Sequence, residues 1–172
     1  MTGRTSAARA RAIRLLVLDV DGVLTDGRLV YGPGGEETKV FHVRDGHAIV
    51  VARAAGVEVA VVSGRKSAAV TRRLEDLGVR EVHQGVADKA ALLSDLCARY
   101  RLRPAEVAFM GDDLPDLPLL RRVGLALAPA DGVPEVRRTA HWTSRRRGGA
   151  GAVREAIEWL LRARRAWPPP LV

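Results

Sequence analysis

The stretch Leu15-Leu16-Val17-Leu18-Asp19-Val20-Asp21-Gly22-Val23-Leu24-Thr25-Asp26-Gly27 sets the fold of this chain. Its apolar first part predicts a strand that is buried on both faces, as in parallel sheets. Asp19 and Asp21 stand where that strand gives way to a loop, and their spacing of two residues places both side chains on one side of the chain. Because ligands of open α/β sheets bind at the carboxyl ends of the strands, this loop is expected to face a small ligand.

Apolar β-type runs and segments of helical periodicity alternate along the rest of the chain. Further strands are expected near residues 57–62, 80–83, 107–110 and 124–127. Helices are expected over residues 45–55, 67–77, 89–100 and 117–122 and after residue 151. This alternation predicts an α/β fold with a doubly wound parallel sheet of the Rossmann-like kind.

Two local signals follow the first strand. Residues 28–31 and 38–41 flank a Gly/Pro turn, which predicts a β-hairpin flap. Asp45 is a candidate N-cap of the next helix, because an aspartate side chain satisfies free backbone N–H groups at a helix start.

The 172 residues predict one domain over residues 13–163, with a flexible basic tail at 1–12 and a Pro-rich tail at 164–172. No apolar run approaches the length of a membrane span. The single cysteine, Cys97, cannot form an internal disulfide, which favours a reducing cytoplasm. We interpret Cys97 as a packed helix residue rather than a reactive thiol.

The chain is basic, with a formal net charge of +8 that comes from 25 Arg and 3 Lys against 20 acidic residues. Such a charge is compatible with a nucleic-acid or acidic-lipid partner. Aromatic residues make up only 4% of the chain, so stacking platforms for single strands are scarce. A nucleic-acid partner is therefore not expected, and a small anionic substrate suits the same positive field.

Polar residues gather at the ends of four predicted strands or at the helix starts that follow. They are Asp19 and Asp21, Ser63, Lys89, and the group Asp112, Asp113 and Asp116. Carboxylates crowded into one crevice repel each other and require a positive charge. Since few His or Cys residues stand near these positions, Mg²⁺, a hard cation with oxygen ligands, is favoured over zinc. Mg²⁺ held by one or two carboxylates usually binds a phosphate group.

These residue types suit phosphate-ester hydrolysis. An aspartate can attack phosphorus, and a second carboxyl two residues on can protonate the leaving alkoxide and then activate water. Ser63 can hydrogen-bond a phosphoryl oxygen, and Lys89 can neutralise charge on phosphate and nucleophile. The competing structural roles are a turn residue for Ser63, a solvated helix start for Lys89 and a helix cap for Asp116.

At these positions the chain resembles the haloacid dehalogenase superfamily of phosphatases. Asp19-Val20-Asp21-Gly22-Val23-Leu24-Thr25 is similar to its first motif, Ser63 to the second, Lys89 to the third, and Gly111-Asp112-Asp113-Leu114-Pro115-Asp116 to the fourth. The resemblance implies that Asp19 is the nucleophile and Asp21 the acid/base. It also implies Mg²⁺ on Asp19, Asp112 and the backbone carbonyl of Asp21, with Asp113 and Asp116 supporting.

The short gaps between these motifs leave no room for a cap domain. An active site without a cap domain is either open to macromolecules or closed by a neighbouring subunit. The runs 39–47, 62–65 and 151–155 resemble the capless phosphatases of 3-deoxy-D-manno-octulosonate 8-phosphate and of nonulosonate 9-phosphates. That resemblance implies a homotetramer whose hairpins meet neighbouring subunits and whose sites are covered by a neighbour's C-terminal segment. It further implies substrate contacts from Asp21, Arg44, Asp45, Gly46, Ser63, Arg65, Arg73 and Lys89.

The chain departs from the octulosonate pattern at three positions. His42 replaces the usual Asn, while Val50 and Ala150 stand where that family often has Arg. An arginine can bind a carboxylate through two hydrogen bonds, whereas valine and alanine cannot. The expected function is therefore Mg²⁺-dependent hydrolysis of a phosphomonoester of a keto-deoxy sugar acid through an aspartyl-phosphate. The alternatives are a phosphatase acting on nucleic-acid ends and a non-catalytic binding domain of the same fold.

Overall fold

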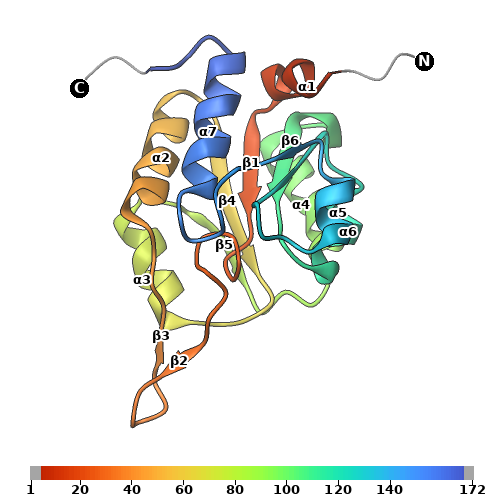
Figure 1. Ribbon diagram of the computed structural model, residues 1–172. Coiled ribbons are helices and arrows are strands. Elements are labelled where there is room, and N and C mark those ends of the chain that lie inside the picture. Colours follow the sequence, from red (N-terminus) through yellow and green to blue (C-terminus); the bar gives the residue numbers. More distant parts are fainter. Residues whose placement is uncertain (1–4, 169–172) are drawn as a thin grey trace.

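A computed structural model describes residues 5–168 and centres on a parallel sheet (Figure 1). Its six strands run in the order β5-β4-β1-β6-β7-β8. The strands are β1 Leu15–Leu18, β4 Glu58–Ser63, β5 Glu81–Gln84, β6 Val107–Met110, β7 Leu125–Ala128 and β8 Trp142–Thr143. The chain builds outward from β1 through β4 to β5, and then returns to the other side of β1 for β6, β7 and β8. This reversal confirms the doubly wound sheet and places a topological switch point between β1 and β6.

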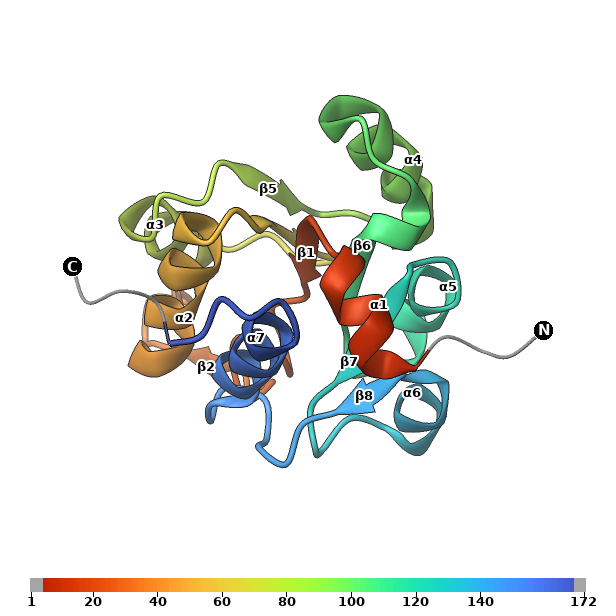
Figure 2. The same ribbon diagram turned by 90° about the horizontal axis from the view of Figure 1, so that it is seen from above.

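Helices cover both faces of the sheet (Figure 2). One face is covered by α1 Ser6–Ala12, α2 Val43–Ala54, α3 Ala68–Asp76 and α7 Ala152–Ala163. The other is covered by α4 Lys89–Tyr100, α5 Leu117–Leu120 and α6 Pro134–Thr139. Two short 3₁₀ helices, η1 Pro104–Glu106 and η2 Leu114–Asp116, precede β6 and α5. In β1, Leu16 and Leu18 enter the first core and Leu15 and Val17 the second, so every position of the strand is buried.

The predicted hairpin forms as β2 Val30–Tyr31 and β3 Glu37–Thr38, which pair antiparallel. It extends past the carboxyl edge of the sheet, while α1 and the last turn of α7 lie at the opposite edge (Figure 1). Between the end of β1 and the end of β4, the chain contains only this hairpin and α2, so no cap domain is inserted there. None of the helices in the described part of the chain is long and apolar enough to cross a bilayer.

The N-terminal segment corrects one prediction. Residues 1–12 were expected to be a flexible tail, but residues 6–12 form α1 and pack on the sheet. Ala10 is fully buried, the Ser6 hydroxyl donates to the His141 carbonyl at 2.6 Å, and an Arg9 Nη1 donates to the Gly124 carbonyl at 2.8 Å. The small alanine side chains let this short helix approach the sheet closely. Residues 1–4 lie outside the described part.

The C-terminal segment corrects another prediction in part. Residues 164–168 were assigned to a Pro-rich tail, yet Ala166 and Trp167 pack against the core. The Arg154 guanidinium lies 4.8 Å from the centre of the Trp167 ring, within the range of a cation–π contact. The remaining part of that predicted tail, residues 169–172, lies outside the described residues. Two further elements, α6 and β8, were not predicted at all.

The burial of α1 predicts a matched pair of stability effects. Ala10→Glu should lower the free energy of unfolding by more than about 3 kcal/mol, because it places an unpaired carboxylate in the core. Ala7→Glu, at an exposed position of the same helix, should change it by less than about 0.5 kcal/mol. Urea unfolding of both variants measures the difference. Equal effects would mean that α1 does not dock in solution.

Candidate active site

Three carboxylates meet at the switch point of the sheet. Asp19 follows β1, Asp112 follows β6, and Asp116 ends η2. One oxygen from each lies within 4.8 Å of the others. Asp19 and Asp116 are buried and Asp112 is half-buried, so the structure brings together three of the acids that the sequence singled out.

Lys89 is the cation beside these carboxylates. It is the first residue of α4, a helix whose start is fixed by the Asp88 side chain accepting from the backbone N–H groups of Ala90 and Ala91. The Lys89 Nζ lies 2.9 Å from Asp19 Oδ1 and 2.6 Å from Asp116 Oδ1, and its side chain is buried. Lys89 is therefore part of the acidic site rather than a solvated helix start.

The electrostatics of the site show an excess of negative charge. Burial and the Asp116 carboxylate raise the pKa of Asp19 to about 6, although Lys89 opposes the shift. Burial and the neighbouring Asp19, Asp116 and Asp113 raise the pKa of Asp112 to about 8. Burial alone would lower the pKa of Lys89, but the Asp19 and Asp116 carboxylates outweigh it and the pKa is raised. One ammonium cannot balance these acids, and a donor set made only of carboxylate oxygens fits Mg²⁺.

The loop after β1 is closed by its own backbone. The Val20 carbonyl accepts from the N–H groups of Leu24 and Thr25 at 2.9 and 3.0 Å. Gly22 has a φ of +85°, and a Cβ at this position would overlap the carboxylate of Asp112. A glycine is required here for two reasons, since the backbone is left-handed and the Asp112 carboxylate occupies the space of a side chain.

The fourth motif divides its acids between two tasks. Asp116 Oδ2 accepts from the backbone N–H of Asp112 at 2.9 Å, while its Oδ1 binds Lys89. Asp116 therefore belongs to the acid cluster and also orients the Asp112 loop. Asp113 is exposed, and its side chain accepts from Leu114 N–H at the start of η2. Its carboxylate is not among the three clustered acids, although its charge helps to raise the pKa of Asp112. The supporting role of Asp113 at the metal stays a prediction.

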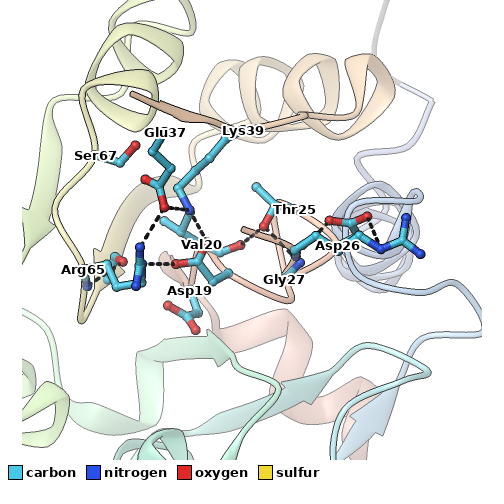
Figure 3. A network of polar contacts seen from close by, with 12 residues as sticks. Asp19, Val20, Thr25, Asp26, Gly27, Glu37, Lys39, Arg65 and Ser67 are labelled. Atoms are coloured by element: carbon cyan, nitrogen blue, oxygen red, sulfur yellow. Dashed lines mark hydrogen bonds and ion pairs between the residues drawn. The ribbon is translucent and has the colours of Figure 1, made fainter. Parts of the chain in front are cut away.

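Asp21 lies outside the acid cluster and faces the hairpin. The strand ends at Leu18, so strand alternation no longer sets the direction of the Asp21 side chain. Asp21 Oδ1 accepts a hydrogen bond from Lys39 Nζ, and Asp21 Oδ2 lies 3.8 Å from Arg65 Nε. Glu37 binds the same two cations, at 3.4 Å from Lys39 Nζ and 2.8 Å from Arg65 Nη2 (Figure 3). The metal contact expected from the Asp21 backbone carbonyl stays a prediction.

No role was assigned to Glu37 or Lys39 from the sequence. One signal was available, because the chain has only 3 Lys and one of them, Lys39, stands two residues after Glu37 at the end of the hairpin. The two side chains do meet, with Lys39 Nζ 3.4 Å from Glu37 Oε1. Partial burial alone would raise the pKa of Glu37, but hydrogen bonds and the charge of Lys39 lower it overall, so Glu37 is held as a carboxylate.

Ser63 is the last residue of β4 and is buried at the carboxyl edge of the sheet. Its Oγ accepts from the Arg65 backbone N–H at 3.1 Å, which holds the turn that carries the Arg65 side chain toward Glu37. The placement of Ser63 at a strand end agrees with the sequence expectation, and its contact with phosphate stays a prediction.

The predicted substrate contacts on α2 and α3 fall into different surroundings. Asp45 is not the N-cap of α2, because that helix begins at Val43. Its buried carboxylate instead accepts from the N–H groups of Gly151 and Arg154 at 3.2 and 2.7 Å, and so caps α7, whose own N-cap residue, Gly151, has no side chain. The Arg73 guanidinium lies directly over Gly46.

Arg44 is exposed and lines a groove beside α7 that also includes Arg146, Ala150 and Trp159. The lining of this groove contains none of the clustered acids. The structure therefore does not bring Arg44 to the acid cluster within this one chain.

Comparisons with known proteins agree with this geometry. The model of the haloacid dehalogenase-like hydrolase family matches residues 78–157. The 3-deoxy-D-manno-octulosonate 8-phosphate phosphatase of Escherichia coli (strain K12) is 46% identical over 156 residues, which cover 91% of this chain and 83% of that protein. The chain belongs to the haloacid dehalogenase-like hydrolases.

This chain also resembles solved structures of related proteins. A probable YrbI family phosphatase from Pseudomonas syringae is 48% identical, with a TM-score of 0.90 over 92% of this chain and 90% of that one. The 3-deoxy-D-manno-octulosonate 8-phosphate phosphatase of Moraxella catarrhalis is 36% identical, with a TM-score of 0.92 over 94% and 93% of the two chains. That protein was solved in complex with magnesium ion, phosphate ion and KDO.

The close approach of Gly22 to Asp112 predicts a selective effect on the metal. Gly22→Ala and Gly56→Ala should each cost about 1 to 2 kcal/mol of stability, because both backbones are left-handed. Only the methyl at position 22 meets the Asp112 carboxylate, whereas nothing lies near a Cβ at position 56. Gly22→Ala should therefore weaken Mg²⁺ binding at least about tenfold and Gly56→Ala should not. Calorimetric titration with Mg²⁺ measures this, and equal affinities would contradict the assignment of Asp112.

Proposed function

We propose that this chain is a Mg²⁺-dependent phosphatase that hydrolyses a phosphomonoester of a keto-deoxy sugar acid, of the 3-deoxy-D-manno-octulosonate 8-phosphate or nonulosonate 9-phosphate type. The observation that carries the proposal is the largely buried group of Asp19, Asp112, Asp116 and Lys89 at the switch point of the sheet, in which only Asp112 is half-buried. The 46% identity to the E. coli phosphatase supports the octulosonate ester as the first candidate. We also infer a cytoplasmic location, which the single cysteine supports.

Asp19 is the nucleophile in this proposal. An oxygen of its carboxylate forms a bond to phosphorus while the bond from phosphorus to the leaving alkoxide breaks. Lys89 holds Oδ1 of Asp19 in place and offsets charge on the phosphoryl group. Mg²⁺ held by Asp19 and Asp112 supplies further positive charge for the phosphoryl oxygens when it is bound.

Asp21 handles the proton in both halves of the reaction. It gives a proton to the leaving alkoxide in the first half, which releases the sugar alcohol. In the second half it takes a proton from the attacking water, whose oxygen bonds to phosphorus as the bond from phosphorus to Asp19 breaks. Phosphate is released, and both aspartates return to their starting states.

The sugar acid requires contacts beyond the phosphate. We assign Arg65 and Arg73 to the carboxylate and hydroxyl groups of the sugar acid, with the Gly46 backbone beside Arg73. Ser63 is assigned to a phosphoryl oxygen. Arg44 and Asp45 are retained as secondary candidates, Asp45 by fixing the start of α7. Val50 and Ala150 carry no charge. Arg44, Arg65 and Arg73 must therefore supply the positive charge that an arginine at position 50 or 150 supplies in relatives.

Replacing the nucleophile gives the direct test of this function. Asp19→Asn should lower phosphate release from 3-deoxy-D-manno-octulosonate 8-phosphate by at least roughly a thousandfold, because the amide cannot attack phosphorus. Asp95→Asn, which alters an exposed acid on α4, should keep full activity. The assay measures phosphate release with Mg²⁺ and with chelator. Release from oligonucleotide ends but from no sugar phosphate would instead support the macromolecular alternative.

We further propose a homotetramer in which the hairpins meet neighbouring subunits. The hairpin and the start of α2 expose a run of apolar side chains that includes Leu29, Val30, Tyr31, Val40 and Val43, with Val40 72% and Val43 77% exposed. Several large apolar side chains exposed on one segment are typical of an interaction surface. A neighbour seated there can also exclude water from the nearby site.

Charge on this patch should break the assembly. Analytical ultracentrifugation should give the wild-type protein a mass four times that of the monomer. Val40→Glu should shift the protein toward smaller species, because it places carboxylates in an apolar interface. Val50→Glu, at an exposed position farther along α2, serves as the control and should leave the mass unchanged. A monomeric wild-type chain would contradict the shared lid.

A further inference from the structure

Lys39 is a buried cation in an otherwise exposed hairpin. Its side chain is only 1% exposed, while its neighbours Thr38 and Val40 face solvent. Lysine is among the residues that are rarely buried without a charged partner. Burying an ammonium costs several kcal/mol unless ion pairs and hydrogen bonds compensate. The charged groups that compensate the burial of Lys39 therefore indicate the role of this residue.

The partners of Lys39 form an alternating set of charges. Lys39 Nζ binds Asp21 and Glu37, and Arg65 lies against the same two carboxylates from the turn after β4. Figure 3 shows Glu37 between Lys39 and Arg65. Whenever Asp21 is ionised, two positive and two negative groups balance within this set. Lys39 is its buried cation, whereas the Arg65 side chain is 45% exposed.

The two oxygens of Asp21 are not equivalent in this arrangement. Oδ1 accepts the hydrogen bond from Lys39, whereas the Arg65 Nε at 3.8 Å from Oδ2 is beyond hydrogen-bond distance. One carboxyl oxygen is thus held by the hairpin and the other has no hydrogen-bond donor among the described residues. A carboxyl group fixed through one oxygen keeps a single orientation for the other.

We propose that Lys39 is a positioning residue for Asp21, so that the hairpin completes the acid/base machinery of its own subunit. The inference rests on the proposed function, because Asp21 needs a fixed orientation only if it transfers protons to and from substrate. Oδ2 is the atom that gives the proton to the leaving alkoxide and later takes one from water. Lys39 stays an ammonium throughout and exchanges no proton. Its charge compensates the carboxylate that remains after Asp21 has given its proton.

A positioning role makes the effect of Lys39 depend on the leaving group. An alkoxide needs a proton as it departs, whereas p-nitrophenolate leaves readily without one. Lys39→Met should lower kcat for the sugar phosphate about 10- to 100-fold, which is part of the usual contribution of general acid catalysis, with KM changed less than about twofold. The first-turnover release of p-nitrophenolate from p-nitrophenyl phosphate should change less than about threefold.

Two variants separate positioning from general damage to the hairpin. Glu37→Gln weakens the contacts of this residue with Arg65 and Lys39 but keeps the Lys39–Asp21 pair, so the ratio of the two rates should stay near that of the wild type. Lys66→Met alters an exposed lysine beside the same turn and should leave both rates unchanged. In an Asp21→Asn background, Lys39→Met should have little further effect on the first turnover of the sugar phosphate, because Lys39 acts through Asp21.

Folding is checked by circular dichroism and by the rise in melting temperature on adding Mg²⁺, and Lys39→Gln replaces Lys39→Met if the latter does not fold. Equal losses with both leaving groups, no loss with either, or a higher KM at unchanged kcat would overturn the inference. So would the full defect in Glu37→Gln or full additivity with Asp21→Asn. If the wild type hydrolyses neither ester, the proposed function itself fails, which is a different result from an unchanged ratio in an active enzyme.

Discussion

The contact on which the rest of the site depends is the buried Lys89 ammonium between Asp19 and Asp116. It joins the end of β1, the start of α4 and the short helix η2, which belong to the two halves of the sheet. A buried ion pair gains little net stability, because desolvation of the charges offsets their attraction. Here two carboxylates share one ammonium and a third acid lies beside them, so the folded site keeps a demand for positive charge. That demand is what makes this point of the fold a place for a divalent cation and a phosphate ester.

The sheet order explains why these groups can meet. β1 lies between β4 and β6, so the chain leaving β1 has strand ends on both sides and a crevice between it and β6. Ser63 arrives from one neighbour and Asp112 from the other. The turn at Gly22 then keeps side-chain atoms out of the space that the Asp112 carboxylate occupies. Local backbone geometry and long-range topology are both needed for the acid cluster.

A feature of this fold could be predicted from the sequence where neighbouring residues carry its signal, and could not where distant contacts decide it. The strand at residues 15–18 and the acids after it were found because burial on both faces and the strand end leave a pattern in consecutive residues. The helix α1 was missed because its alanines are as compatible with a loose tail as with close packing, and only the sheet and α7 decide between them. Asp45 was read as the cap of its own helix, whereas it caps α7 more than a hundred residues away. No local pattern shows such a pairing.

The two acids of the first motif are held by different parts of the fold. Asp19 is held by Lys89 from a helix of the sheet, and Asp21 is held by Lys39 from a hairpin that extends past the sheet. The proposed nucleophile thus lies at the end of a buried strand, and the proposed acid/base depends on an exposed hairpin. Because a short two-stranded hairpin is marginally stable alone, its ion pairs with Asp21 and Arg65 also hold it against the site. If hairpins pack against neighbouring subunits, assembly would stabilise the same element that orients the proton donor. Oligomerisation and catalysis would then be coupled through one lysine side chain.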